Sequence, residues 1–537
     1  MAEVYARKAT GLVREASLVD TVFFGIMNNA VAVCIWFFLS EAPYGYPGLN
    51  VLLTCVIGLI LTVGFGFMWG ILGGSMPRSG GSYVYNSRII HPAIGTAVSM
   101  CNAAFVMVMW IWVLCPWIPE VGVPILAGCM GIAPETIAFW ATTPEGMYIM
   151  STIVNLLAFV VIALGLQTYF RIQKFMVIWG MIGVIIAAVI FTTTPHATFV
   201  NIWNNYAAET GSLNFAQTIE AVDVAMEGIP TTWNLSSTLH ALLPFSWVSV
   251  YGYIIAFIGG EVKSPRRNIL IGQVLNVVVS VLLLTWVSLS FEAMGGYNFL
   301  HAQSYIDMEG GVALEGVGEY AFPFSTTYIN IGSLIVGFQP ILGFIMGMSF
   351  IFMDFLWIPF SYIAFSRGLL AWGMDRIGPM WFTDVNLRLG SPLKVLFLCF
   401  VLSQIVLTDY CWHPEVLGAL SVELMQLLSV FGVTAIACTI FPFVKKVRHI
   451  WDTSPYKGWR VIGIPAATIA GIVSLILVGI LIWASYYPEI LADLLATWSW
   501  IYIIVWISGL AWYFGWKSYR ARQGIDITLA FKELAPE

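Results

Sequence analysis

Polar and ionisable side chains stand inside three long apolar segments of the sequence, where they could bind a small solute or an ion. Asp354 lies in SFIFMDFLW, Asn28 and Asn29 lie in FFGIMNNAV, and Ser249 lies in PFSWVSVYGY. An ionised Asp at the centre of a bilayer costs ~2.5–3.5 kcal/mol or more, so it should be neutral, paired or in contact with water. Buried amides carry a similar penalty unless they are hydrogen-bonded.

Asp354 is the sharpest single candidate. It precedes Arg367 by 13 residues, which places it about 20 Å from that residue along a helix and therefore inside the hydrocarbon. We expect Asp354 to bind a proton, a sodium ion or a cationic substrate. The alternative is a structural role, in which Ser, Thr or backbone groups donate hydrogen bonds to a buried carboxyl group.

Aromatic side chains gather in the segment around Ser249. Pro244, the Ser residues and Gly252 loosen a helix there. Trp247, Tyr251 and Tyr253 could wall a cavity and offer a cation–π surface worth ~0.5–2 kcal/mol. The alternative is ordinary aromatic packing, just as Asn28 and Asn29 could simply join neighbouring helices. The candidate substrate-binding residues are Gly25, Met27, Asn28, Asn29, Ser246, Trp247, Ser249, Tyr251, Gly252 and Tyr253.

The composition identifies the class of protein that must position these residues. Of the 537 residues 59 % are hydrophobic and only 10 % are charged, against about 25 % charged in an ordinary soluble domain. A soluble fold cannot bury so much apolar surface, which excludes a soluble enzyme, a disordered protein and a nucleic-acid binder. We therefore expect an all-α polytopic membrane protein in the lipid bilayer.

Several kinds of chemistry are not expected. The eight Cys residues form no CxxC pattern or Cys/His cluster, so neither a metal site nor a disulfide framework is predicted. There is no P-loop pattern, so ATP does not drive the protein. No His, Asp, Cys and Ser residues converge at one depth. We predict no cofactor, no enzymatic activity and no nucleic-acid partner.

Twelve stretches are long and apolar enough to cross the bilayer as helices, which takes about 20 residues each. The predicted spans are 17–39, 49–73, 92–117, 147–168, 174–194, 240–262, 267–291, 328–365, 392–409, 415–444, 460–483 and 493–516. The eighth is too long for one straight crossing and could begin with a separate external helix.

The basic residues support this count. With a cytoplasmic N-terminus, all 23 Lys and Arg residues fall in cytoplasmic segments. The opposite loops 195–239 and 292–327 contain acidic residues and no Lys or Arg, and we expect short surface helices in both. The sequence thus predicts a multi-pass protein of the cell (plasma) membrane with both termini in the cytoplasm.

Three cytoplasmic segments carry motifs. Residues 77–85 (PRSGGSYVY) follow the second span, residues 260–268 (GEVKSPRRN) follow the sixth, and residues 366–379 (SRGLLAWGMDRIGP) follow the eighth. The sequence GSP at 390–392 then opens the ninth span. Together they resemble the amino acid–polyamine–organocation (APC) superfamily of permeases, and the resemblance covers most of the chain.

The resemblance implies a LeuT-type architecture, formed by the whole chain, 1–537, as one transmembrane transporter domain. Two inverted repeats of five spans each, 17–194 and 240–444, would be followed by two peripheral helices, 460–516, and a cytoplasmic tail, 517–537. Helices one and six would be discontinuous at mid-membrane, with the substrate between them.

The first helix departs from the usual Gly-rich break of the family. Gly25 is followed by Met27, Asn28 and Asn29, which makes an amine plausible beside an amino acid as substrate. The resemblance therefore implies a secondary active transporter, a monomer or homodimer, that moves a small amino acid or related amine by alternating access. It would be coupled to protons or sodium or run as an exchanger. The alternative is a non-transporting solute sensor on a permease fold.

Overall fold

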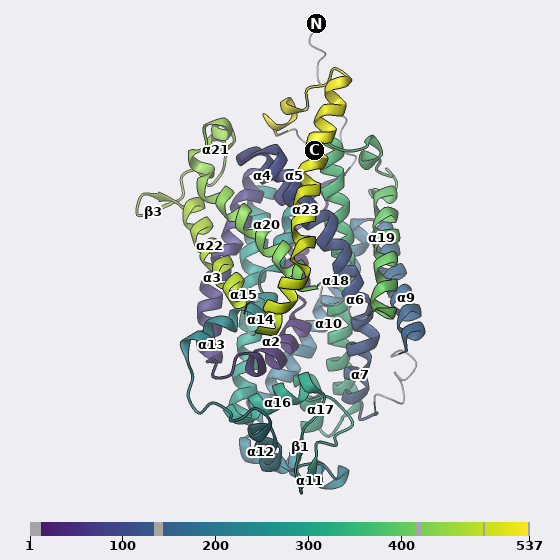
Figure 1. The fold of residues 1–537 in the computed structure, drawn as a ribbon, viewed down its shortest axis with the longest axis vertical. Helices are drawn as coiled ribbons and strands as arrows, with labels where there is room; N and C mark the ends of the chain where they lie inside the picture. The colour runs from purple at the N-terminus through teal and green to yellow at the C-terminus, as the bar shows by residue number, and fades with distance from the viewer. Residues whose placement is uncertain (1–11, 134–142, 414–419, 487–488, 535–537) are drawn as a thin grey trace.

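The computed structural model describes residues 12–133, 143–413, 420–486 and 489–534, without the side chains of 420–423 and 489–498. Among these residues, twelve helical segments are long and apolar enough to cross a membrane, so the predicted count of spans is confirmed. The chain is an all-α polytopic membrane protein (Figure 1). The first residues of the predicted tenth span, 415–419, lie outside the described residues.

The first five spans are formed by ten elements, several of them joined end to end. They are α1 (Leu18–Asn28), α2 (Val31–Gly45), α3 (Val51–Ser75), α5 (Pro92–Ser99), η1 (Met100–Val106), α6 (Met107–Trp117), η2 (Ile118–Gly122), α7 (Val123–Cys129), α9 (Pro144–Ala163) and α10 (Leu166–Thr193). The short helix α4 (Ser82–Ile89) precedes the third span.

The remaining seven spans begin after a long loop. They are formed by α13 (Leu235–His240), α14 (Leu242–Trp247), η3 (Tyr251–Ile258), α15 (Pro265–Gly295), α18 (Pro340–Met374), α19 (Leu393–Trp412), α20 (Leu420–Ile440), η6 (Phe441–Phe443), α22 (Ala466–Ala484) and α23 (Glu489–Arg522).

The connecting segments have small elements of their own. At one end of the bundle lie α11 (His196–Thr210), α12 (Phe215–Ala225), α16 (Tyr297–Glu309), β1 (Ala313–Leu314), β2 (Gly318–Glu319) and α17 (Tyr328–Ile335). At the other end are η4 (Met380–Thr383), η7 (Lys445–Val447), α21 (Arg448–Asp452), β3 (Arg460–Val461), β4 (Ile464–Pro465) and η8 (Ile527–Phe531). The predicted surface helices are therefore present, and α17 is the separate helix expected before the eighth span.

The two ends differ in charge. We call the end that carries α4, α21 and β3 the basic end, and the end that carries α11, α12, α16 and α17 the acidic end (Figure 1). Loops 195–239 and 292–327 at the acidic end contain no Lys or Arg. Such a segregation of basic residues to one end is common in polytopic membrane proteins.

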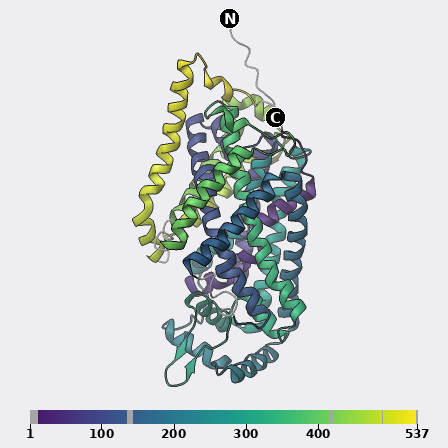
Figure 2. The ribbon, with the colours of Figure 1, turned by 90° about the vertical axis from the view of Figure 1, so that its right-hand side faces the viewer.

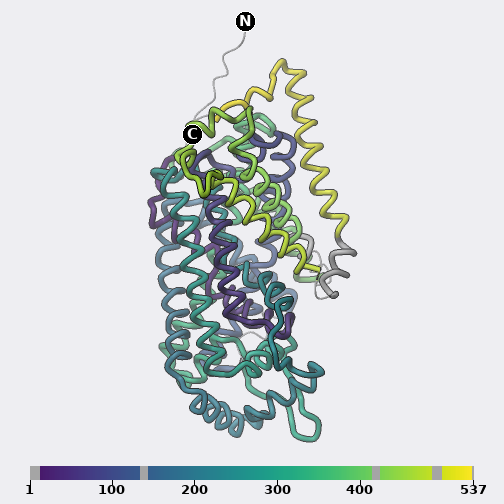
Figure 3. The backbone as a smooth tube through the Cα atoms, turned by 90° about the vertical axis from the view of Figure 1, so that its left-hand side faces the viewer, coloured from purple at the N-terminus to yellow at the C-terminus, as the bar shows by residue number. Residues whose placement is uncertain are grey.

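Three of the first five spans pack against the span five places later in the sequence, alongside other extensive contacts such as those of α10 with α18 and of α1 with α15. The second span contacts the seventh (α3 with α15), the third contacts the eighth (α6 with α18), and the fourth contacts the ninth (α9 with α19). The last two spans lie outside this arrangement. Helix α22 packs on α3 and α20, and α23 packs on α5 and α20 along the edge of the bundle (Figures 2 and 3).

The first helix shows how the sequence starts a span. Ser17 and Asp20 form a capping box, since the Asp20 N–H donates to Ser17 Oγ at 3.3 Å and the Ser17 N–H donates to the Asp20 carboxylate at 2.9 Å. This box satisfies backbone donors that the first turn leaves free. Asp20 also accepts a salt bridge of 2.6 Å from Lys174 of α10, which attaches α1 to the fifth span.

Candidate functional site

The first span is interrupted near its middle. Helix α1 ends at Asn28, and Ala30 takes a left-handed conformation with φ of 36° before α2 begins at Val31. A residue other than Gly in this region is strained by of order 1–3 kcal/mol, so the surrounding structure must hold it. Part of that support comes from Trp357 of α18, whose indole N–H donates to the Asn28 carbonyl at 2.6 Å.

The sixth span is interrupted as well. Helix α14 ends at Trp247, and the chain resumes at Tyr251 as a 3₁₀ helix, η3. The hydroxyls of Ser246 and Ser249 donate to local carbonyls, those of Leu243 at 2.8 Å and of Ser246 at 3.1 Å. Side chains that bond the backbone in this way compete with the regular helix ladder. Both interruptions occur where the sequence predicted them.

Asn29 joins the two interruptions. Its side-chain Nδ2 donates to Asn276 Oδ1 at 2.9 Å and to Ser280 Oγ at 3.1 Å, and its side-chain Oδ1 accepts a hydrogen bond of 3.0 Å from the Gly252 N–H. All four residues are buried. The two breaks therefore lie at the same depth, and α15 holds them together.

Gly25 and Gly252 permit this close approach. A Cβ atom on Gly25 would lie 2.6 Å from the Asn276 side chain, and one on Gly252 would lie 2.3 Å from Asn276 Oδ1. Both glycines are thus needed for contact between backbone and amide. In this conformation they contact Asn276, while their predicted part in substrate binding stays a prediction.

Four aromatic rings surround the second break. Trp110 of α6 lies 4.6 Å from Tyr251, 5.4 Å from Trp357 and 6.1 Å from Trp247 between ring centroids. The Trp247 and Tyr251 rings are 5.6 Å apart. Trp247 is only partly buried, whereas the other three are buried. Two of the three predicted aromatic residues therefore belong to this aromatic cluster.

Tyr253, the third predicted aromatic residue, points elsewhere. Its hydroxyl donates to Asn102 Oδ1 of η1 at 2.8 Å, and its ring lies 5.1 Å from Trp69 and 4.9 Å from Phe431. Met27 also contacts a different neighbour, because the Tyr169 hydroxyl lies 3.7 Å from its sulfur.

Asp354 is fully buried on α18. Among the described residues, neither of its carboxylate oxygens has a hydrogen-bond partner, so the alternative of a hydrogen-bonded structural Asp is not observed. Asp354 precedes Trp357 by one helical turn and therefore lies on the same face, toward the break in the first span.

Asn28 offers a second unused polar atom at the same place. Its Nδ2 donates to the Phe24 carbonyl, while its Oδ1 has no partner within the described chain. A buried carboxylate and a buried amide oxygen without partners leave acceptor atoms unsatisfied, as at several other buried polar groups of the described chain. Such groups are free to bind a donor that enters the site.

Sequence reasoning missed four residues of this region: Asn102, Trp110, Asn276 and Trp357. Asn276 was open to the argument used for Asn28 and Asn29, since it is an amide within an apolar span. Trp357 lies three residues after Asp354, the spacing that places two side chains on one helical face. Nothing in the sequence distinguishes Trp110 from the many other Trp residues in apolar spans.

No group of His, Cys, Asp and Glu residues in the described part of the chain could hold a metal ion. No protein-family model matches the chain, and none of the curated proteins is significantly similar to it. Membership of the APC superfamily therefore remains a proposal.

Proposed function

We propose that this protein is a secondary active transporter that moves a small amino acid or related amine by alternating access. One observation carries the proposal: two interrupted spans meet at one depth through Asn29, beside the buried and unpartnered carboxylate of Asp354. Backbone inside a membrane can leave the helix only where protein or a cavity satisfies its polar groups. In carriers this arrangement places substrate and ions at mid-membrane.

The packing of the spans supports two inverted repeats of five. A two-fold axis in the membrane plane that relates repeats 17–194 and 240–444 brings the equivalent spans nearest to it into contact. Such contacts occur for the second, third and fourth spans, and the two breaks meet through Asn29. Because five is odd, equivalent spans cross the membrane in opposite directions.

The groups around the breaks favour a substrate with an ammonium group. Asp354 supplies a negative charge, and the rings of Trp110, Trp247, Tyr251 and Trp357 supply cation–π surfaces worth ~0.5–2 kcal/mol. Helix α2 begins at the break with no side-chain cap, so the first N–H groups of the helix can donate hydrogen bonds to a substrate carboxylate. This favours an amino acid or an amine.

We propose that Asp354 couples the movement of substrate to that of a proton or a sodium ion. Its burial without a partner means that the charged form needs a cation beside it or a proton on it. Exchange of two cationic solutes over the same carboxylate is the other mode that this chemistry permits. The basic end then faces the cytoplasm and the chain lies in the plasma membrane.

Uptake by purified protein in liposomes tests this proposal. Labelled amino acids and amines are offered with an imposed proton gradient, with a sodium gradient, and with neither. We expect accumulation with one of the two gradients, or exchange with a preloaded solute. Binding without uptake under every condition would identify a solute sensor on a permease fold.

The matching variant is Asp354→Asn. It should abolish gradient-driven accumulation, because a neutral amide cannot take up and release a cation. Asp384→Asn is the control, since Asp384 is an exposed carboxylate paired with Lys394 at the basic end. Unchanged ion dependence in Asp354→Asn would remove Asp354 from the coupling mechanism.

A further inference from the structure

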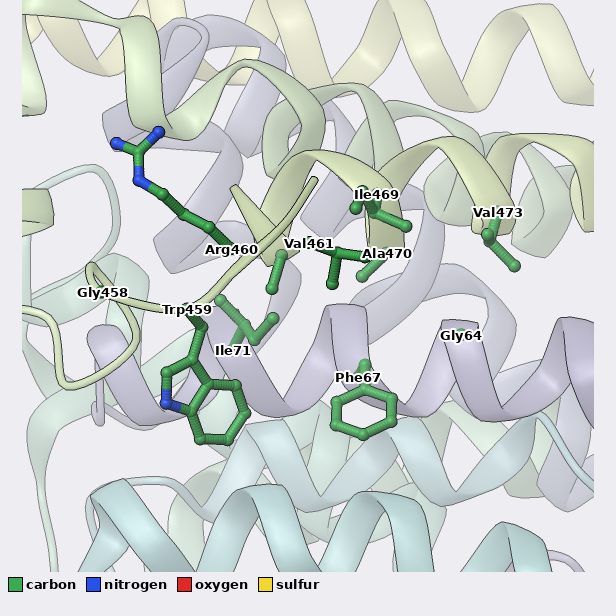
Figure 4. Close-up of a pocket in the computed structure, with 11 residues that line it drawn as sticks. Gly64, Phe67, Ile71, Gly458, Trp459, Arg460, Val461, Ile469, Ala470 and Val473 are labelled. Carbon is green, nitrogen blue, oxygen red and sulfur yellow. The ribbon is translucent and has the colours of Figure 1, made fainter. Parts of the chain in front are cut away.

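A groove of about 570 Å³ runs between α3 and α22 at the basic end, away from the two helix breaks (Figure 4). Its walls are almost wholly apolar. The lining residues are Gly64, Phe67, Ile71, Gly458, Trp459, Arg460, Val461, Ala466, Ile469, Ala470 and Val473.

Each wall is one stripe of a helix. Gly64, Phe67 and Ile71 recur at the spacing of one face of α3, and the residues between Ala466 and Val473 do the same on α22. The helices almost touch at the inner end, where a Cβ on Gly64 would lie 2.4 Å from Val473 Cγ1. Seven residues of helix separate that point from the mouth, which gives an apolar depth of about 10 Å.

The groove opens on the lipid-facing surface of the bundle. Ile60 and Val56 of α3 are 64 % and 47 % exposed, and Ile472 and Ile476 of α22 are 45 % and 51 % exposed. Apolar side chains of this size on the outside of membrane spans are covered by acyl chains. A lipid can therefore enter the groove sideways from the bilayer.

A positive charge stands at the mouth. The Arg460 guanidinium donates one hydrogen bond of 2.9 Å to the Gly463 carbonyl and, among the described residues, pairs with no carboxylate. The neighbouring Lys457 is neutralised by Asp452 at 2.8 Å. Figure 4 shows the Arg460 side chain directed away from the groove floor, while Trp459 lies beside Ile71. The site thus has a charged group at its mouth and an apolar groove behind it, which matches the charged headgroup and the acyl chain of a phospholipid.

The hairpin that bears Arg460 has an apolar tip. Its turn residues, Ile462 and Gly463, have φ of 50° and 77°, as the tight turn between β3 and β4 requires. Ile462 is 96 % exposed, and Val461 and Ile464 are 55 % and 47 % exposed. The hairpin projects sideways from the bundle (Figure 1), where such residues and Trp459 suit the membrane–water interface.

We propose that the groove binds an anionic phospholipid, with an acyl chain between α3 and α22 and the phosphate on the Arg460 guanidinium. The hairpin tip enters the interface beside the headgroup. Selectivity for an anionic headgroup follows because the Arg460 guanidinium, which pairs with no carboxylate of the described chain, lies at the mouth, whereas the apolar walls contact only the acyl chain. This site is independent of the proposed transport function.

Lipid retention by the full-length protein tests the proposal. The protein is placed in nanodiscs of phosphatidylcholine with a minor fraction of phosphatidylglycerol, extracted into mild detergent, and analysed by native mass spectrometry. We expect the wild type to retain phosphatidylglycerol in preference to phosphatidylcholine. Arg460→Gln should lower phosphatidylglycerol retention about fivefold, the effect of one basic residue near the surface, and leave phosphatidylcholine unchanged.

Two further variants make the result decisive. Ala466→Phe fills the groove and should lower retention of both lipids, whereas Arg388→Gln removes an exposed cation elsewhere at the same end and should change neither. Arg460 is exposed, so the Arg460→Gln result stands even if Ala466→Phe does not fold. Unchanged phosphatidylglycerol retention in Arg460→Gln, or an equal loss in Arg388→Gln, would overturn the proposal.

Discussion

The two ends of the bundle are closed by different chemistry. At the basic end, Arg367 donates two hydrogen bonds of 2.9 Å to the Glu261 carboxylate, and Arg78 and Arg88 reach the Asp375 carboxylate at 3.0 and 2.7 Å. All five side chains are buried. These ion pairs connect α4 and the residues just before it with the residues that follow η3 and with both the C-terminal part and the C-cap of α18, on the basic side of the helix breaks.

The N-terminal segment completes this closure. The backbone N–H groups of Glu15 and Ala16 both donate to the Glu261 carbonyl, at 2.9 and 3.0 Å, and the Lys263 N–H donates to the Ala16 carbonyl at 2.9 Å. The chain before α1 is thereby attached to the end of the sixth span. Opening the basic end requires the release of these bonds as well as the ion pairs.

The acidic end is held by hydrogen bonds to one carboxylate, that of Asp307, and, among the described residues, not by buried ion pairs. Asp307 of α16 accepts hydrogen bonds from Trp36 Nε1 at 2.7 Å and from the hydroxyls of Ser40 and Ser325. Loss of water around it raises the pKa of Asp307 to about 6, although the bonds from Ser40 and Trp36 act to lower it. No Lys or Arg is present in the loops of this end.

The difference indicates which end opens more readily. Opening the basic end separates buried charges that are each held by several bonds, and an uncompensated buried charge is strongly destabilising. Opening the acidic end only exchanges a few hydrogen bonds for bonds with water, at ~0.5–1.5 kcal/mol each. We therefore expect the site to face the acidic side at rest, and four predictions test this contrast.

The largest effect is expected for Glu261→Gln. It leaves the Arg367 guanidinium buried opposite a neutral amide, which should cost ~3–5 kcal/mol of stability. Thermal unfolding of the purified protein measures the loss. An unchanged unfolding temperature would mean that this ion pair does not hold the basic end.

The next effect is the pH dependence of the acidic end. The pKa of Asp307 is about 6 in the closed structure against 3.8 for a solvated Asp, so the closed form binds the proton more tightly. Stability from this group is complete below pH 3.8 and is lost as the pH rises through about 6. The shift in the pKa of Asp307 corresponds to at most about 3 kcal/mol of stability of the closed form. Solvent that reaches the carboxyl group lowers this value.

Asp307→Asn isolates that contribution. We expect the difference in unfolding temperature between wild type and Asp307→Asn to change across the interval from 3.8 to about 6 and to be constant above it. A difference that does not vary with pH would show that Asp307 keeps an ordinary pKa.

A smaller effect is expected for Trp36→Phe. It removes the indole N–H that donates to Asp307 and keeps most of the ring. The loss should be about 1 kcal/mol, and it should be greater above the pKa of Asp307, where the carboxylate is ionised. The stability lost in Trp36→Phe is measured by unfolding at one pH below that pKa and at one pH above it. Equal losses at the two pH values would contradict the idea that the acceptor becomes ionised in this range.

The smallest effect is expected for Lys394→Ala. Lys394 and Asp384 form a salt bridge of 2.6 Å at the basic end, but their side chains are 64 % and 50 % exposed. Solvent screening limits such a pair to less than ~1 kcal/mol. A loss as large as that of Glu261→Gln would contradict the distinction between buried and exposed pairs.

Much of the fold was predictable because the positions of membrane spans depend on two properties that can be read in the sequence, the length of apolar stretches and the distribution of charge. Hydrophobic length and the one-sided distribution of Lys and Arg gave twelve spans, and the bounds differ by a few residues at most ends. The largest differences occur in the third span, which π-helical segments extend to Cys129, and in the eighth span, which begins at Pro340 and ends at Met374.

The residues that meet at the two helix breaks were predictable only in part, and their role in binding a substrate stays a prediction. Asn29, Trp247 and Tyr251 could be named because polar and aromatic residues next to helix-loosening residues stand out in an apolar span. The partners Asn276 and Trp110 come from spans far away in sequence, and only tertiary packing brings them to the breaks. Their recognition required the structure.

Thiol accessibility at the sixth-span break tests the central claim most directly. Ser249→Cys is introduced after replacement of the eight native Cys residues, with exposed Glu315→Cys and Arg388→Cys as controls for the two sides. In oriented vesicles, an impermeant maleimide added on the acidic side should label position 249 at a pH above about 6. The same reagent added on the basic side should label it once a transported solute or an imposed gradient drives the protein into the conformation that is open to that side. Labelling of both control positions but never of position 249, from either side and under every condition, would contradict a pathway between the interrupted spans.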